Sequence, residues 1–259
     1  VSVLRKPTMP ASYSWYSEGS ILKTDRNKPL LLNGENVYEI NQKNPSAISV
    51  DALPFRGLSH VHYGADGKAW YMIKTDMEKT FCRGDTIFGN QFFYDARDDN
   101  AGNIWIGSSK GLIKFNTRSK EITQYQHNDK NANSIPSDFI YALEPDNEFG
   151  NIWMAAYNGG LCSYNIASDK FRNYTKDDGL ADNIVYSLEK DHHGNFWFST
   201  NAGISTYQAT SNVFRNYSTA DGLLNNEYNR RSSCKNDSGW LFFGGIFGID
   251  YFHPDSILK

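Results

Sequence analysis

The sequence predicts an all-β fold, a β-propeller with about six four-stranded blades in this chain of 259 residues. A Gly-x-x-Trp motif recurs along the chain, and its anchors are spaced by 35, 48, 44 and 45 residues. Aromatic residues make up 15% of the chain, which suits blades that bury both faces against their neighbours. The anchors are Trp70, Trp105, Trp153, Trp197 and, in the last copy, Phe242.

The clearest copy, Asp191–Tyr207, has the pattern of a β-hairpin. A polar turn over 191–195 leads into an aromatic strand over 196–200, and a second turn leads into a strand over 204–207. Asn, Asp and Gly favour tight turns, while aromatic and β-branched residues favour strands. A second Gly follows each of the last four anchors, so these copies share one register: Gly111, Gly160, Gly203 and Gly248.

A single propeller domain over 1–259 is predicted, because no linker-like or low-complexity segment interrupts the repeats. The last copy has three strands, and an open sheet edge would leave backbone N–H and C=O groups unpaired. The short β-prone segment 1–6 is therefore the candidate closing strand. The repeats extend approximately over 12–57, 58–90, 91–126, 139–175, 183–218 and 228–252.

The segments between repeats are similar to one another as well. Asp178-Gly179-Leu180 and Asp221-Gly222-Leu223 mark two crossings between blades, and residues 242–254 read Phe-Phe-Gly-Gly-Ile-Phe-Gly-Ile-Asp-Tyr-Phe-His-Pro. Through these segments and the Trp anchors, the chain resembles the two-component regulator propeller repeat family. That family forms the periplasmic sensor region of hybrid two-component system histidine kinases of the Bacteroides type. Because its propellers are often seven-bladed, the alternative is that this chain is part of a seven-bladed ring.

The resemblance implies a ligand-sensing domain without catalysis, located in the periplasm as part of a membrane-anchored sensor. The histidine kinase would lie elsewhere in the parent protein. The resemblance also implies a homodimer that forms through the parent receptor.

Composition and motifs argue against several other classes of protein. A net charge of −3 without a Lys/Arg cluster disfavours nucleic-acid binding and membrane contact by this region. No run of apolar residues has transmembrane length. Cys82, Cys162 and Cys234 lack metal-ligand spacing and are expected to be isolated core residues. The sequence has no Ser/His/Asp grouping, phosphate loop or zinc motif, so we expect no cofactor, metal or catalytic residue.

Along the predicted innermost strands, the positions whose side chains point to one face of the sheet are polar in every aligned copy. The favoured interpretation is a ring of hydrogen bonds and ion pairs between blades; a ligand-lined channel and a metal bound by two histidines are the alternatives. His192 and His193 lie in a turn and are expected to be solvated. The aligned polar positions are His60 and His62, Asp95 and Arg97, Ala142 and Glu144, Ser187 and Glu189, and Ser232 and Cys234.

Ligand contacts are predicted on the loops that lead into the innermost strands and on the turns between second and third strands. Residues that vary there on a shared frame are the ones that carry specificity. Amide and charged groups beside aromatic rings suit a carbohydrate, whose hydroxyls need hydrogen bonds and whose C–H faces pack on rings. The predicted ligand-binding residues are Lys110, Tyr157, Asn158, Asn201, Tyr228, Arg230 and Phe247.

Three functional hypotheses follow. The leading one is an extracytoplasmic ligand-sensing propeller that binds an oligosaccharide or contributes receptor dimer contacts. The second is a propeller lyase acting on a polysaccharide or small molecule, with His60, His62 or Glu144 as general base. The third is a protein-interaction scaffold. The lack of a clear acid/base constellation disfavours the enzyme.

Overall fold

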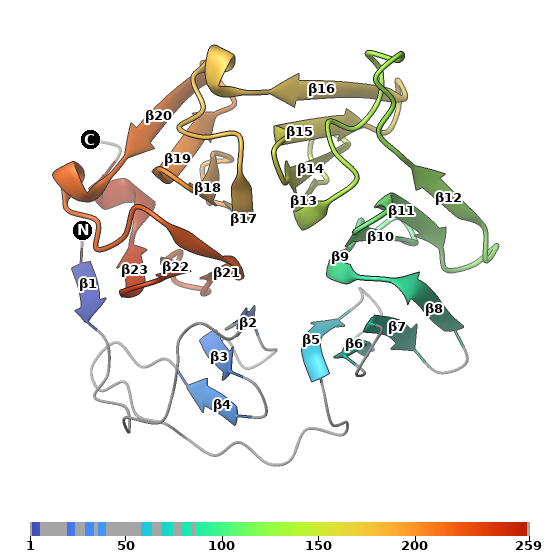
Figure 1. Cartoon of the computed structure of the whole chain (residues 1–259), viewed down its shortest axis with the longest axis horizontal. Coiled ribbons are helices and arrows are strands. Elements are labelled where there is room, and N and C mark those ends of the chain that lie inside the picture. The colour runs from blue at the N-terminus through green and yellow to red at the C-terminus, as the bar shows by residue number, and fades with distance from the viewer. Residues whose placement is uncertain are drawn as a thin grey trace.

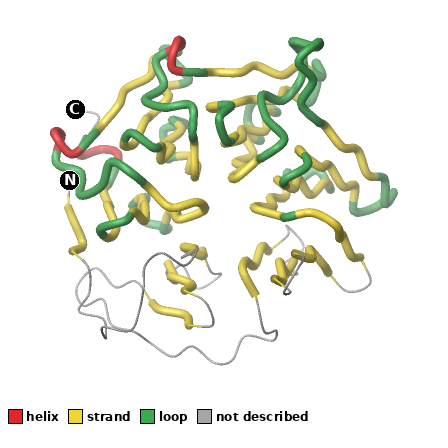
Figure 2. Tube along the Cα trace, viewed as in Figure 1, coloured by secondary structure: helices red, strands yellow, loops and turns green. Residues whose placement is uncertain are grey.

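The computed structural model describes the backbone of residues 2–5, 20–23, 29–33, 36–39, 58–63, 69–74, 79–83 and 86–257, and the side chains of residues 91–257. In this part the chain is all-β, with three short 3-10 helices near the periphery (Figure 2). The elements are β1 (Ser2–Arg5), β2 (Ser20–Lys23), β3 (Pro29–Asn33), β4 (Asn36–Glu39), β5 (Leu58–Tyr63), β6 (Ala69–Lys74), β7 (Lys79–Arg83), β8 (Thr86–Gln91), β9 (Phe93–Asp98), β10 (Asn103–Ser108), β11 (Gly111–Asn116), β12 (Ile122–Tyr125), β13 (Ile140–Asp146), β14 (Asn151–Ala156), β15 (Gly160–Asn165), β16 (Lys170–Tyr174), η1 (Lys176–Asp178), β17 (Val185–Lys190), β18 (Phe196–Thr200), β19 (Gly203–Gln208), β20 (Val213–Tyr217), η2 (Thr219–Asp221), β21 (Tyr228–Lys235), β22 (Leu241–Gly245), β23 (Gly248–Phe252) and η3 (Pro254–Ser256).

The described strands form antiparallel sheets that are arranged around a common centre as the blades of a propeller (Figure 1). Among the described residues, five sheets have four strands and one, β2–β4, has three. One strand of each sheet lies nearest the centre and contacts the innermost strand of the next sheet: β2, β5, β9, β13, β17 and β21. An all-β propeller of four-stranded blades is thus confirmed, whereas the number of blades, six or seven, stays a prediction.

The sheet that contains β21, β22 and β23 takes its outermost strand from the N-terminal end of the sequence. β1 pairs antiparallel with β23, with Ser2 opposite Tyr251 and Arg5 opposite Gly248. The pairing covers the backbone edge of β23 that an open sheet would expose.

The Trp anchors occupy equivalent buried positions between neighbouring sheets. Trp105, Trp153 and Trp197 are 0%, 4% and 0% exposed. Each stacks on the last tyrosine of the outermost strand of its own sheet, and each contacts an aromatic ring of the next sheet, as Trp153 contacts Phe196 with 4.5 Å between ring centroids. The aromatic rings therefore fill the wedges between blades.

The turns before Trp105 and Trp197 share one hydrogen-bond geometry, which explains the spacing of the motif. Asp191 Oδ1 accepts a hydrogen bond from the backbone N–H of Asn195, and Asp191 Oδ2 accepts one from Trp197 Nε1 at 2.8 Å. Asp99 makes the same bonds to Asn103 and Trp105, with the indole bond at 3.0 Å. One carboxylate thus closes the turn and orients the buried indole.

The crossings between blades are short capped turns. Thr175 and Ser218 cap η1 and η2 in capping boxes, and Gly179 and Gly222 end them with positive φ values of 106° and 96°. The leucines that follow, Leu180 and Leu223, are buried in the hydrophobic clusters on either side of the β17–β20 sheet.

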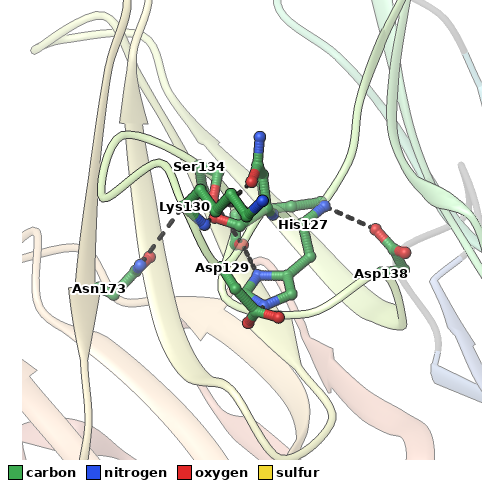
Figure 3. A network of polar contacts seen from close by, with 8 residues as sticks. His127, Asp129, Lys130, Ser134, Asp138 and Asn173 are labelled. Atoms are coloured by element: carbon green, nitrogen blue, oxygen red, sulfur yellow. Dashed lines mark hydrogen bonds and ion pairs between the residues drawn. The ribbon is translucent and has the colours of Figure 1, made fainter.

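A longer loop over 126–139 joins β12 to β13 and is held by its own polar contacts (Figure 3). The backbone N–H of His127 donates to Asp138 Oδ1 at 2.7 Å, and Asn173 Nδ2 donates to the carbonyl oxygen of Ser134 at 3.3 Å. Ile135, buried in this loop, packs in the same cluster as Trp105. The loop is therefore part of the packed body.

Candidate functional site: the tyrosine collar

The loops that lead into the innermost strands and the turns between second and third strands lie side by side on one face of the propeller. In each of four sheets a backbone N–H of the turn donates to a backbone carbonyl of the loop. These bonds bring together residues that are distant in the sequence. They are Ser109 to Phe92 at 2.8 Å, Tyr157 to Phe139 at 3.0 Å, Asn201 to Ile184 at 3.3 Å and Ile246 to Glu227 at 3.4 Å.

A β-bulge places a tyrosine at the start of three successive innermost strands. In β9, Phe93 pairs with Ser108 and Asp95 with Gly107, so Tyr94 is the extra residue of the bulge. The same shift leaves out Tyr141 in β13 and Tyr186 in β17. Because a bulge re-aims the side chain of its extra residue, these three tyrosines leave the alternation of the sheet.

The tyrosines from neighbouring blades contact one another. The rings of Tyr94 and Tyr141 meet edge to face at 5.0 Å between centroids, and Tyr141 and Tyr186 are stacked at 6.4 Å. Tyr157, on the β14–β15 turn, lies 5.6 Å from Tyr141 and 6.3 Å from Phe139. The bulges therefore build a continuous aromatic surface across three blades.

Two arginines reach this surface from the opposite side of the ring. The bulge in β21 is longer, because residues 229–232 lie between the pairs Tyr228–Gly245 and Ser233–Phe243. Arg230 places its guanidinium over the ring of Tyr141, with 5.4 Å from Cζ to the centroid, and Arg231 Nη1 donates to the carbonyl oxygen of Tyr94 at 3.0 Å. Arg231 has a φ of 54°, in the left-handed region. We call Tyr94, Tyr141, Tyr157, Tyr186 and Arg230 the tyrosine collar.

The collar offers an exposed rim above a buried base. Tyr94 and Tyr141 are 7% and 5% exposed, whereas Tyr157 is 37% exposed and Arg230 is exposed. Burial raises the pKa of the Tyr141 and Tyr186 hydroxyls above their ordinary value, and Arg230 opposes that effect only in part. Both hydroxyls are therefore neutral hydrogen-bond donors at physiological pH.

The structure brings together three of the predicted ligand-binding residues. Tyr157 and Arg230 belong to the collar, and Asn201 accepts a hydrogen bond from Tyr186 Oη at 3.4 Å. Lys110, Asn158 and Phe247 are exposed on the turns of three different sheets, and Phe247 is 65% exposed.

Tyr228 is placed differently from the other predicted residues. It is 3% exposed, and its hydroxyl donates to Asp250 Oδ2 at 2.7 Å. Asp250 also accepts from the backbone N–H groups of Leu224 and Asn225. Tyr228 therefore fixes the loop before β21, because its phenol is turned into the protein rather than toward a ligand.

Polar side chains of the innermost strands form hydrogen bonds and an ion pair between blades, as the favoured interpretation of the sequence predicts. Asp95 Oδ2 accepts from the backbone N–H of Leu143 at 2.9 Å, and Ser233 Oγ donates to Glu189 Oε1 at 2.9 Å. Arg97 Nε lies 3.9 Å from Glu144 Oε2 and Arg97 also pairs with Asp95. The side chains of His60 and His62 lie outside the described residues.

Glu144 belongs to this ring and has a pKa near neutrality. Burial, followed by the charge of Glu189, raises its pKa to about 7, and Arg97 opposes the rise. Burial likewise raises the pKa of Glu189 and Asp95. These groups hold neighbouring blades together at the centre of the propeller, where water has limited access.

The fold and its repeat chemistry define a β-propeller of Trp-anchored blades. The family model described as two component regulator propeller matches residues 179–202, which span the Asp191 turn and the Trp197 anchor. The resemblance predicted from the sequence is confirmed by this match. A comparison with curated proteins finds no match. Among the described residues, no helix has the length and apolar character needed to cross a bilayer.

Solved structures with the same fold include two extracellular domains and one enzyme. An extracellular domain described as that of a hybrid two component system from B. thetaiotaomicron is 16% identical, with a TM-score of 0.60; 98% of this chain and 41% of that chain are covered. A second extracellular domain from that organism, described as that of a one component system, is 11% identical with a TM-score of 0.64, over 95% and 34% of the two chains. Virginiamycin B lyase from Staphylococcus aureus is 12% identical with a TM-score of 0.56, over 92% and 84%. The chain thus spans less than half the length of the two extracellular-domain structures, and these similarities show the fold.

Proposed function

We propose that this chain is the ligand-sensing propeller of a two-component system sensor, and that it binds an oligosaccharide on the tyrosine collar without catalysis. One observation carries the proposal: bulges in three consecutive innermost strands direct tyrosines to the face where Tyr157, Asn201 and Arg230 also lie. The repeat match at 179–202 and the folds of the extracellular sensor domains support the sensing role.

The chemistry of the collar suits a sugar. An exposed ring such as Tyr157 can pack on the C–H face of a pyranose, while the guanidinium of Arg230 and the amide of Asn201 can each form paired hydrogen bonds with vicinal hydroxyls. Because Arg230 already rests on Tyr141 and Asn201 on Tyr186, these groups lose little freedom on binding. Preorganised polar groups beside an aromatic plane favour a neutral polyhydroxylated ligand over an apolar one.

The proposal extends to the setting of the domain. We infer a periplasmic location within a membrane-anchored sensor, a homodimer formed through the parent receptor, and a single propeller domain over 1–259. The six sheets of the described residues favour six blades over seven. The domain would act without cofactor, metal-dependent catalysis, nucleic acid or membrane contact of its own.

Calorimetric titration with a panel of host and plant oligosaccharides tests the proposal. Tyr157→Ala should weaken the binding of a responding glycan by about 1 to 3 kcal/mol, or roughly 5- to 150-fold, since it removes an exposed aromatic platform. Phe149→Ala is the matched control, because Phe149 is an exposed aromatic (62%) on the β13–β14 turn at the other end of β14. Equal effects of the two substitutions, or no binding of any glycan, would favour a scaffold or dimer-contact role instead.

A lyase is the second candidate, and the pKa of Glu144 favours it. A carboxylate with a pKa of about 7 is suited to act as general base, and the virginiamycin B lyase structure shares the fold. Product analysis by chromatography, with polysaccharides and quinupristin as substrates, separates the two functions. Product that forms with the wild type and disappears with Glu144→Gln would establish the enzyme and overturn the sensing role.

A further inference from the structure

Three histidines and one aspartate converge on the face opposite the tyrosine collar. His192 and His193 belong to the β17–β18 turn, and His253 and Asp255 follow β23 in the neighbouring sheet. His193 Nε2 lies 2.7 Å and His192 Nε2 3.2 Å from Asp255 Oδ1, and His253 Nδ1 lies 3.5 Å from Asp255 Oδ2. The sequence indicates a solvated turn for the histidine pair; the rings are exposed, but they share a carboxylate with a third histidine from the next blade.

The hydrogen bond of His253 directs a lone pair into this cluster. His253 Nε2 lies 3.0 Å from the carbonyl oxygen of Ser238, and a carbonyl can only accept, so Nε2 carries the hydrogen. In the neutral ring, Nδ1 is then an unprotonated nitrogen that faces the Asp255 carboxylate, without a hydrogen between them. A histidine that donates its far N–H to a backbone carbonyl is the usual arrangement of a metal-ligating imidazole.

The spacing of the donor atoms matches a tetrahedral metal. Ligand atoms about 2.0 to 2.2 Å from a tetrahedral zinc ion lie about 3.3 to 3.6 Å from one another. The His192 contact with Asp255 Oδ1 at 3.2 Å and the His253 contact with Asp255 Oδ2 at 3.5 Å are close to that spacing, and the His193 contact with Asp255 Oδ1 at 2.7 Å must open to admit an ion. The atoms offered by His192, His193 and Asp255 all lie within 4.8 Å of one another. His253 is not within that distance of all three, so it must shift toward the other two histidines to become the fourth ligand.

The surrounding residues leave room for the cluster in this position. Gly239, in the turn after β21, has a φ of 80°, and a Cβ there would lie 2.9 Å from His253 Nε2 and 3.5 Å from His192 Nδ1. Trp240 packs edge to face against His253 with 5.8 Å between ring centroids. The backbone N–H of His193 donates to Asp191 Oδ1, the same carboxylate that holds the Trp197 anchor. The histidines are thus held from both blades.

We propose that His192, His193, His253 and Asp255 form a binding site for a divalent transition-metal ion such as Zn²⁺. Three imidazoles and one carboxylate are the donors that zinc prefers, whereas Mg²⁺ and Ca²⁺ prefer sites made of oxygen ligands. Metal binding requires Nε2 of His192 and His193 to be without a hydrogen, so a hydrogen that either nitrogen donates to Asp255 is replaced by the ion and its proton goes to Nδ1 of the same ring or to solvent. The bound ion would link the β17–β18 turn to the segment after β23 and so join two adjacent blades.

Metal titration of the untagged, metal-stripped protein tests the site, with Zn²⁺ measured by competition against a chromophoric chelator and Co²⁺ by its visible spectrum. Each experiment uses a His60→Ala/His62→Ala background, so that these two histidines contribute nothing. We expect one Zn²⁺ per chain, a tetrahedral Co²⁺ spectrum and no competition from Mg²⁺. His193→Ala and Asp255→Asn should each weaken Zn²⁺ binding by more than about tenfold, because even outer-shell partners of a metal typically contribute 10- to 100-fold.

His127→Ala provides the matched control. His127 also bonds to a backbone carbonyl, that of Ile135, and to a carboxylate, that of Asp129, but it belongs to the separate loop over 126–139 (Figure 3). His127→Ala should leave Zn²⁺ affinity unchanged. At the same Zn²⁺ concentration, the rise in melting temperature should be larger for this control than for His193→Ala. Absence of Zn²⁺ binding in the wild-type cluster, or an equal loss with His127→Ala, would overturn the proposal.

Discussion

Asp146 occupies the position of Asp191 in its own repeat, yet its carboxylate does not reach Trp153. Asp146 Oδ1 instead accepts from Lys190 Nζ of the next blade at 2.7 Å, and Trp153 Nε1 is a buried donor without a hydrogen-bond partner. The insertion of one residue before Gly150 separates the two groups. The repeat thus exchanges a contact within a blade for an ion pair between blades.

This difference predicts unequal effects of the same substitution at two anchors. Trp197→Phe should lower the free energy of unfolding by about 1 to 3 kcal/mol more than Trp153→Phe, because only Trp197 loses a hydrogen bond to a charged group. Both substitutions remove similar apolar surface, so their packing costs largely cancel. Urea denaturation followed by far-UV circular dichroism measures the difference; equal costs would mean that the Asp191 bond contributes little.

Glu144 should make stability depend on pH. Its folded pKa of about 7 exceeds the ordinary value of 4.5, so the folded state keeps a proton that the unfolded chain loses between these values. The contribution is therefore fully present below about pH 4.5 and is lost as pH rises through 7. Glu144→Gln should flatten the decline in unfolding free energy across this window by up to about 3 kcal/mol, at about 1.4 kcal/mol per pKa unit.

Urea denaturation between pH 4.5 and 8 checks that expectation. Part of the slope should persist in the variant, because burial also raises the pKa of Glu189 and Asp95. A variant with the same pH profile as the wild type would show that Glu144 titrates normally.

The pairing of β1 with β23 predicts that the first residues matter for stability. Removal of residues 1–6 should expose the backbone edge over Gly248–Phe252, lower the melting temperature and promote aggregation. Calorimetry and light scattering measure both effects. A second variant with Val3→Pro, which removes one backbone donor while keeping the length, should show a weaker form of the same defect. Unchanged melting and solubility in both would show that closure does not depend on β1.

Two glycines with similar backbone angles should respond differently to alanine. Gly203 has a φ of 104° and a Cβ there would lie 2.1 Å from the carbonyl oxygen of Tyr217, whereas Gly222, with a φ of 96°, has nothing within 4 Å. Gly222→Ala should cost about 1 to 2 kcal/mol from the left-handed conformation alone. Gly203→Ala should cost about 1 to 3 kcal/mol more, because β19 and β20 must separate. The difference in unfolding free energy between the two variants measures the cost of the Cβ clash at Gly203. Equal values would show that the clash costs nothing.

The sequence predicts the repeated frame well, because each copy repeats the same local chemistry. The buried positions of Trp105, Trp153 and Trp197 and the buried leucines after the crossings agree with the spacing of the motifs. The hydrogen bonds between blades at the centre agree with the polar residues that recur along the innermost strands.

The candidate site is harder to predict from the sequence than the fold. Simple alternation along a strand does not reveal a bulge, so Tyr94, Tyr141 and Tyr186 were not among the predicted ligand-binding residues, although an aromatic or apolar residue followed by Tyr recurs in all three copies. Tyr228 resembles these residues in type, but it precedes the bulge of β21 and pairs in the ladder. His253 joins His192 only through the packing of neighbouring blades, and no local pattern contains that contact.

The bulged positions separate recognition from architecture. Residues 94, 141 and 186 lie outside the ladder pairs that define their sheets, and each belongs to a different blade. Substitutions there change the chemistry of the face and leave the register of every strand intact. Because the rings of Tyr94, Tyr141 and Tyr186 contact one another and the first two are buried, substitutions at these positions are coupled, and a new specificity evolves by matched changes that keep the ring contacts between blades.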